Sequence, residues 1–100
     1  MTVPKPEYRL LTADELAAGL DQLDDWSVVD GKLHKEFRFG DFAEAFGFMA
    51  AAAIIAERLN HHPEWFNVYA TVRVDLTTHD VGGLSPYDLA LAARMDELAS

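Results

Sequence analysis

The segment from Asp41 to Asn60 constrains the fold most, because it is a long helix whose two ends are both marked in the sequence. The Asp41 side chain can cap the first turn, and Glu44 stands at the position that completes a capping box. Asn60 suits the left-handed residue that closes a helix, and Pro63 stops any continuation. We therefore predict a helix that runs to about Leu59.

This helix is apolar over more of its circumference than packing on one sheet face requires. One apolar stripe consists of Phe42, Phe46, Met49, Ala53 and Ala56, and a second consists of Ala45, Phe48, Ala52 and Ile55. Alanine is tolerated anywhere in a helix, which would explain the alanines but not Phe48 and Ile55. We expect the second stripe, with Ala56, to pair with another copy of the chain, giving a homodimer or homotetramer through residues 41–59.

The chain before this helix shows a capped helix followed by a β-hairpin. Thr12 and Glu15 have capping-box spacing, and leucines then share one helical face to about Leu23. Asp30-Gly31 is a two-residue turn between extended segments at 26–29 and 33–39. The second segment places Leu33, Phe37 and Phe39 on one face and Lys32, His34, Glu36 and Arg38 on the other. We expect helices to cover the apolar face.

The chain after the long helix alternates apolar and polar residues from Asn67 to His79. Thirteen extended residues are long for so small a domain, so we expect a turn or bulge near Ala70-Thr71 to divide them into two strands. Ser85 and the proline after it then start a last helix, with Asp88 as the capping-box carboxylate.

These elements predict one α+β domain over residues 1–100, in the order α-β-β-α-β-β-α. The four strands should form an antiparallel sheet with the three helices packed on one face. We expect residues 1–11 to be a flexible or extended N-terminal segment.

Composition excludes several classes of function. Seventeen acidic residues against eight Lys and Arg give a net charge of -9, so we expect no direct binding to nucleic acid. The absence of cysteine excludes disulfides, a thiolate nucleophile and sulfur-based metal sites. The first eleven residues lack a signal-peptide core, and the longest uncharged run, twelve residues, is too short to cross a bilayer. We expect a cytoplasmic protein that does not enter a membrane.

Three of the four histidines stand where predicted elements end, and we expect them to meet in one cleft. His61 and His62 follow the long helix, and His79 follows the last strand. Glu57 lies one helical turn before His61 and can orient its imidazole. Further along the chain, an aromatic group suited to a flat heterocycle consists of Trp65, Phe66 and Tyr69.

Each of these residues could also have a purely structural role. The adjacent histidines could simply complement the helix dipole, and Asp88 is accounted for as a helix cap. The imidazoles and Glu57 could bind zinc. We predict no metal, because adjacent histidines before a proline tend to point apart and no pair of histidines is spaced four residues apart on a helix.

Only the joint spacing decides between these readings. Glu57-x3-His61-His62-Pro63-x5-Tyr69-x9-His79-x8-Asp88 resembles the signature of the pterin-4a-carbinolamine dehydratases, a family that includes the dimerisation cofactor of a hepatocyte homeodomain transcription factor. The resemblance implies dehydration of 4a-hydroxytetrahydropterin to quinonoid dihydropterin without a metal or cofactor. An alternative is a noncatalytic binding or assembly factor, or a transcriptional coactivator, on the same scaffold.

The resemblance also implies roles for single residues. His61 and His79 would act as general acids, and His62 would mainly hold the pterin, so the catalytic set is His61, His62 and His79. The implied substrate-binding residues are Glu57, His62, Pro63, Trp65, Thr77 and Thr78. The implied supporting residues are Asn60, Tyr69 and Asp88. Asn60 and Thr77 stand where many relatives carry an acidic residue and a serine.

Overall fold

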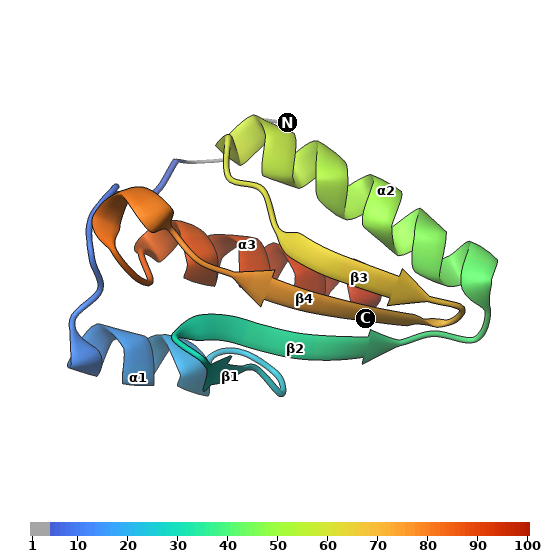
Figure 1. Cartoon of the computed structure of the whole chain (residues 1–100), viewed down its shortest axis with the longest axis horizontal. Coiled ribbons are helices and arrows are strands. Elements are labelled where there is room, and N and C mark those ends of the chain that lie inside the picture. The colour runs from blue at the N-terminus through green and yellow to red at the C-terminus, as the bar shows by residue number, and fades with distance from the viewer. Residues whose placement is uncertain (1–4) are drawn as a thin grey trace.

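The computed structural model describes residues 5–100, and there a four-stranded antiparallel sheet packs against helices on one side (Figure 1). The elements in chain order are α1 (Ala13–Asp21), β1 (Ser27–Val29), β2 (Lys32–Arg38), α2 (Phe42–Leu59), β3 (Glu64–Val68), β4 (Thr71–Leu76), the 3-10 helix η1 (His79–Val81) and α3 (Pro86–Ala99). The sheet order is β1-β2-β4-β3. The predicted fold class and element order are confirmed.

Local signals set the first elements as the sequence indicates. Thr12 and Glu15 form both bonds of a capping box at the start of α1. Asp30 and Gly31 have φ angles of 52° and 77°, the positive values that a tight hairpin turn requires. Residues 1–4, which belong to the predicted N-terminal segment, lie outside the described residues.

The third and fourth strands differ in part from the prediction. The chain turns at Tyr69 and Ala70, where a break was expected, but β3 begins at Glu64 and so earlier than Asn67. Tyr69 has a φ of 50°, and the turn changes which side the residues face. Val68 is therefore exposed on β3, although the apolar residues of β4, which are Val72, Val74 and Leu76, are all fully buried.

The face of α2 that packs inside the chain is not the one predicted to do so. The stripe predicted as an interface is buried in the chain's own core, and it consists of Ala45, Phe48, Ala52, Ile55 and Ala56. Phe48 packs against Phe37 and Phe39, with ring centroids 4.7 and 5.0 Å away. The prediction that Phe48 and Ile55 pair with another copy is wrong, because both residues already fill the space between α2 and the sheet.

The exposed apolar side of α2 includes Phe42, Phe46 and Ala53 of the other stripe, together with Ile54. Phe42, Phe46 and Ile54 are each more than half exposed, and Ala53 is exposed beside them. Phe42 and Phe46 pack against each other, with ring centroids 5.9 Å apart. We call Phe42, Phe46, Ala53 and Ile54 the outer stripe of α2.

The helix α3 is fixed at both of its ends. At its start Ser85 and Asp88 form a capping box, as predicted. Near its end Asp96 accepts hydrogen bonds from the Trp26 indole at 2.9 Å and from Lys35 Nζ at 2.7 Å. These bonds tie the last part of α3 to β2 and to the residue before β1.

Candidate active site

Three separate parts of the chain meet at one end of the molecule. The C-terminal end of α2, the segment from β4 into η1, and the start of α3 lie there together (Figure 1). The end of α2 and the segment from β4 into η1, together with Tyr8, border a cavity of about 220 Å³. Its lining residues are Tyr8, Asn60, His61, His62, Thr77, Thr78, His79 and Asp80. We call this cavity the histidine cleft.

His61 is held by a buried carboxylate. Its Nε2 lies 2.6 Å from Asp88 Oδ1, and the two side chains are 10% and 0% exposed. The other oxygen, Asp88 Oδ2, accepts hydrogen bonds from Thr78 Oγ1 at 2.8 Å and from the Ser85 backbone N–H at 2.9 Å. Thr78 and Ser85 also share a bond between their hydroxyls, at 2.7 Å. Both oxygens of Asp88 are therefore occupied, and the ring of His61 is fixed in position.

The end of α2 directs His61 toward α3. Asn60 takes the left-handed conformation that was predicted for it, with φ 52° and ψ 43°. The backbone N–H of His61 then donates to the carbonyl of Ala56 at 3.0 Å, which closes the helix. This geometry places the imidazole against the first turn of α3, with its ring centroid 5.6 Å from that of Tyr87.

His62 and His79 are more open to solvent than His61. Their side chains are 60% and 78% exposed. His62 Nε2 lies 2.9 Å from Glu57 Oε1, so Glu57 orients His62 and not His61, for which it was proposed. His79 Nε2 lies 3.4 Å from Glu64 Oε2. The pKa of Glu64 is below its usual value, mainly because of its hydrogen bond with Lys32 and to a smaller extent because of His79.

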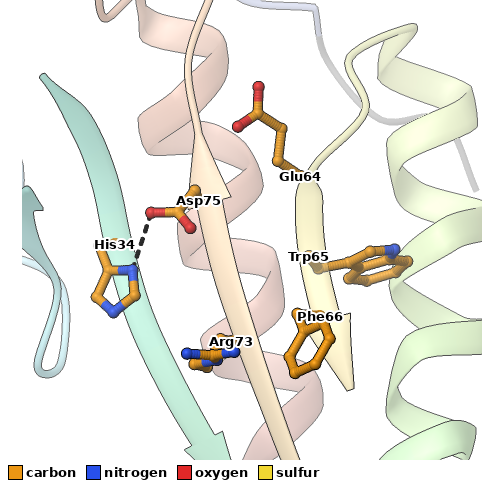
Figure 2. Close-up of a pocket in the computed structure, with 6 residues that line it drawn as sticks. All are labelled: His34, Glu64, Trp65, Phe66, Arg73 and Asp75. Carbon is orange, nitrogen blue, oxygen red and sulfur yellow. Dashed lines mark hydrogen bonds and ion pairs between the residues drawn. The ribbon is translucent and has the colours of Figure 1, made fainter. Parts of the chain in front are cut away.

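The expected aromatic residues do not line the histidine cleft. Trp65 and Phe66 border a different hollow, of about 330 Å³, which also includes His34 and Arg73 (Figure 2). Trp65 packs partly against the core, and Phe66 lies 4.6 Å from the Arg73 guanidinium. Tyr69 is 81% exposed at the β3–β4 turn. The turn is at the other end of β4 from Thr77 and His79, which explains why the structure separates Tyr69 from the cleft.

Two residues of the cleft have no counterpart in the sequence analysis. Tyr8 and Asp80 both line the cavity, and the Tyr8 hydroxyl donates to Asp80 Oδ2 at 2.6 Å. Asp80 directly follows His79, and this adjacency was the available signal. Tyr8 is 72 residues from Asp80 in sequence, so no local spacing could point to it.

The described residues contain neither a cluster of metal ligands nor a membrane-spanning helix. In residues 5–100 no group of three or more His, Cys, Asp or Glu side chains is arranged to hold a metal ion. In the same part of the chain, no helix has the length and apolar character needed to cross a membrane.

The fold agrees with the comparisons to known proteins. The family model described as pterin 4 alpha carbinolamine dehydratase matches residues 9–98. A protein of Solibacter usitatus (strain Ellin6076) that bears the family's name is 53% identical over 90 residues, which are 90% of this chain and 95% of that protein. A protein of the same name from Dinoroseobacter shibae (strain DSM 16493 / NCIMB 14021 / DFL 12) is 59% identical over 76 residues, which are 74% of this chain and 78% of that protein.

A solved structure is similar to this chain over nearly its whole length. It is a crystal structure from Brucella melitensis, described as a transcriptional coactivator/pterin dehydratase. It has 46% sequence identity and a TM-score of 0.87, with 93% of this chain and all of that chain covered. The histidine cleft thus stands on a dehydratase scaffold. The chain belongs to the pterin 4 alpha carbinolamine dehydratase family, as its motif predicted.

Proposed function

We propose that this protein removes water from 4a-hydroxytetrahydropterin and so forms quinonoid dihydropterin. In this reaction the bond between C4a and the hydroxyl oxygen breaks, and the lone pair of the neighbouring ring nitrogen forms a double bond to C4a. The leaving hydroxyl takes up a proton and departs as water, and the ring nitrogen loses its own proton. The reaction therefore needs one group that gives a proton and one that accepts a proton, and imidazoles can do both near neutral pH.

The observation that carries this proposal is the bond between His61 and the buried Asp88. Because Nε2 is bound to the carboxylate at 2.6 Å, Nδ1 is the ring nitrogen left to exchange a proton with a substrate. A carboxylate in this position fixes the orientation of the imidazole and stabilises the charge of its protonated form. An ordinary helix-terminal histidine would need no such partner.

The other cleft residues supply complementary roles in the proposal. His79, which also lines the cavity, gives a second proton donor, and Glu64 Oε2 lies 3.4 Å from its Nε2. His62, oriented by Glu57, holds the pterin, whose amide and amino groups can bond to it. Thr77 and Asn60 complete the polar lining. Thr78 acts through its hydrogen bond to Asp88, and Pro63 follows the end of α2. We assign no substrate contact to Trp65 or Tyr69, because neither residue lines the cleft.

The catalytic roles are tested by substitution in the cleft. His79→Ala removes an exposed imidazole, and His61→Gln removes the titrating ring while keeping a donor for Asp88. We expect each change to lower kcat for disappearance of the 4a-carbinolamine by about 10²-fold, as loss of one general acid would. His34→Ala, which removes a histidine bonded to Asp75 on the other face of the sheet, is the control. Wild-type rates in both cleft variants would refute the assignment.

A second function on the same scaffold is favoured by one observation. The Brucella melitensis structure, at 46% identity, is described as a coactivator as well as a dehydratase. A binding or assembly role for this chain would not depend on the imidazoles. It would therefore survive His79→Ala, whereas the dehydratase reaction would not.

We also propose that the chain forms a homo-oligomer through α2. Its outer stripe leaves three large apolar side chains more than half exposed, the side chains of Phe42, Phe46 and Ile54. Apolar burial between copies contributes about 25 cal/mol per Å², which favours covering such a stripe. The proposed oligomer is a homodimer or a homotetramer, and the cytoplasmic location and the absence of direct nucleic-acid binding stay predictions.

A further inference from the structure

The histidine cleft is lined almost entirely by polar side chains. Its lining includes three histidines, two threonines, an asparagine and an aspartate. A flat bicyclic ring also needs an apolar or aromatic surface beside it to be held firmly. The aromatic residues that follow the histidine pair in sequence do not supply that surface, because Trp65 and Phe66 border the hollow of Figure 2 instead. Among the residues that line the cavity, Tyr8 is the one whose side chain carries a phenyl-type aromatic ring.

Tyr8 has a defined position at the cleft. Its hydroxyl donates to Asp80 at 2.6 Å, and its ring packs edge-on against Tyr87 with centroids 5.6 Å apart. The ring of Tyr87 in turn lies 5.6 Å from that of His61. Tyr8 itself is 54% exposed, so part of its surface is free to contact a ligand. Its pKa is above the usual tyrosine value because of the bond to Asp80, so the phenol stays neutral near pH 7.

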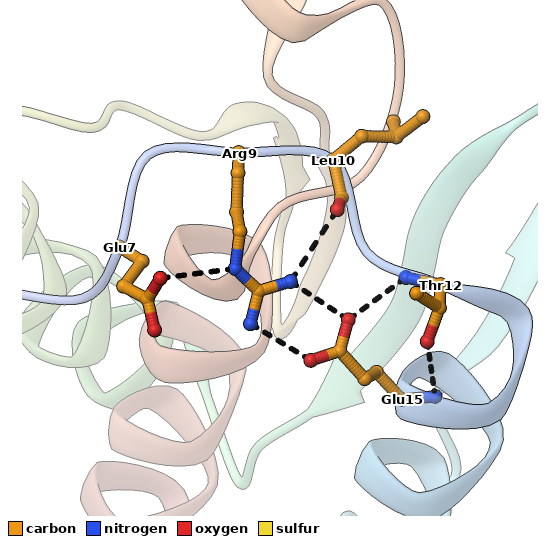
Figure 3. Close-up of polar contacts among 5 residues, drawn as sticks. All are labelled: Glu7, Arg9, Leu10, Thr12 and Glu15. Atoms are coloured by element: carbon orange, nitrogen blue, oxygen red, sulfur yellow. Dashed lines mark hydrogen bonds and ion pairs between the residues drawn. The ribbon is translucent and has the colours of Figure 1, made fainter.

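The segment that carries Tyr8 is clamped to the rest of the fold. Arg9 donates two bonds to the carboxylate of Glu15, at 2.7 and 2.8 Å, and a third to Glu7 at 3.1 Å (Figure 3). Glu15 Oε1 also accepts the backbone N–H of Thr12 at 2.9 Å. These contacts lower the pKa of Glu15 to about 2 and raise that of Arg9, so both groups are charged at neutral pH.

A second set of contacts joins this segment to the loop after η1. The backbone N–H of Leu11 donates to the carbonyl of Leu84 at 2.8 Å. A Cβ at Gly83 would come within 3.0 Å of the Leu10 side chain, so a glycine lets the two segments approach closely. The N-terminal segment therefore lies against the loop that directly follows η1, the 3-10 helix that carries His79 and Asp80 (Figure 1).

We propose that Tyr8 is a substrate-contacting residue that forms the aromatic wall of the histidine cleft. The inference rests on the proposed function, since it assigns the flat pterin ring to that wall. The Arg9–Glu15 clamp and the bond to Asp80 hold the phenol at the cavity before substrate arrives. Tyr8 acts in binding and not in proton transfer, because its hydroxyl is committed to Asp80.

The test separates binding from chemistry. For Tyr8→Ala we expect the Kd for biopterin, a pterin with no hydroxyl at C4a, and the KM for the 4a-carbinolamine to rise about three- to tenfold, the range of one aromatic contact. The kcat should stay within about twofold. Tyr8→Phe keeps the ring and should retain most of the affinity, and Arg9→Ala should weaken binding because it loosens the clamp. Lys5→Ala, an exposed change in the same segment, is the matched control.

Two results would overturn the inference. If Tyr8→Ala binds biopterin like the wild type, or if it loses kcat while the Kd is unchanged, the ring is not a substrate wall and serves only to support the loop. These results leave the proposed function intact. A wild-type protein that neither binds biopterin nor dehydrates the carbinolamine would instead refute the proposed function, and the wall with it.

Discussion

Asp88 shows how one buried carboxylate serves both folding and the site. One oxygen receives the Ser85 N–H that caps α3, and the other meets His61 at 2.6 Å. A side chain that is fully buried needs all of these partners, because a buried charge without them is strongly unfavourable. The helix cap therefore fixes the same group that orients the imidazole.

Substituting Asp88 should separate these two roles. Asp88→Asn keeps an acceptor for the cap but loses the negative charge that faces His61. We expect kcat to fall by at least about tenfold and the free energy of unfolding to fall by only about 1–2 kcal/mol. Dehydration kinetics and thermal denaturation followed by circular dichroism measure both, with Asp14→Asn, a change of an exposed residue of α1, as the control. A folded Asp88→Asn variant with full kcat would show that the carboxylate is only a cap.

Sequence patterns predict the cap of α3 but not the partner of His61. The cap itself could be predicted, because Ser85 and Asp88 are three residues apart. The partner of His61 could not be predicted, because 27 residues separate His61 from Asp88. The nearer acid, Glu57, stands four residues before His61, which is the spacing of neighbouring side chains on a helix, but it bonds His62. Local spacing gives candidates, and only the packing of α2 against α3 chooses between them.

At the scale of elements, α2 shows a similar division. Both of its ends were predicted from Asp41 and Asn60, whose conformations the structure confirms. Its inward side was predicted incorrectly, because two adjacent apolar stripes both satisfy a period of 3.6 residues. The choice depends on contacts with Phe37 and Phe39 of the sheet region, and these lie outside the helix sequence.

The two sides of α2 should respond differently to the same substitution. Phe46→Asp places a charge on the exposed outer stripe, so the chain should stay folded and shift toward smaller species. Phe48→Asp buries an unpaired charge in the core and should unfold the domain, since losing the phenyl ring alone costs about 3–5 kcal/mol. Analytical ultracentrifugation with circular dichroism distinguishes these outcomes. A wild-type chain that is monomeric at micromolar concentration would refute the proposed interface through α2.

At the scale of the whole molecule, the cleft is built from segments far apart in sequence. The β4–η1 segment and the end of α2 were predicted to meet, because each carries a histidine next to a loop. The N-terminal segment was expected to be flexible or extended. In residues 5–11 it forms neither helix nor strand, yet Arg9 clamps it to α1 and brings Tyr8 to the cleft. Such a contact follows from the assembled fold and leaves no periodic signal in the sequence.

We propose that the imidazoles of this cleft dehydrate a pterin carbinolamine without help from a metal. The most direct measurement is the rate at which the 4a-carbinolamine disappears, with and without wild-type protein that has been treated exhaustively with a chelator. We expect the treated protein to accelerate the loss well above the spontaneous rate and to match the untreated protein. A treated protein that leaves the spontaneous rate unchanged would contradict the claim, and recovery of activity on adding zinc would show that a metal carries the reaction.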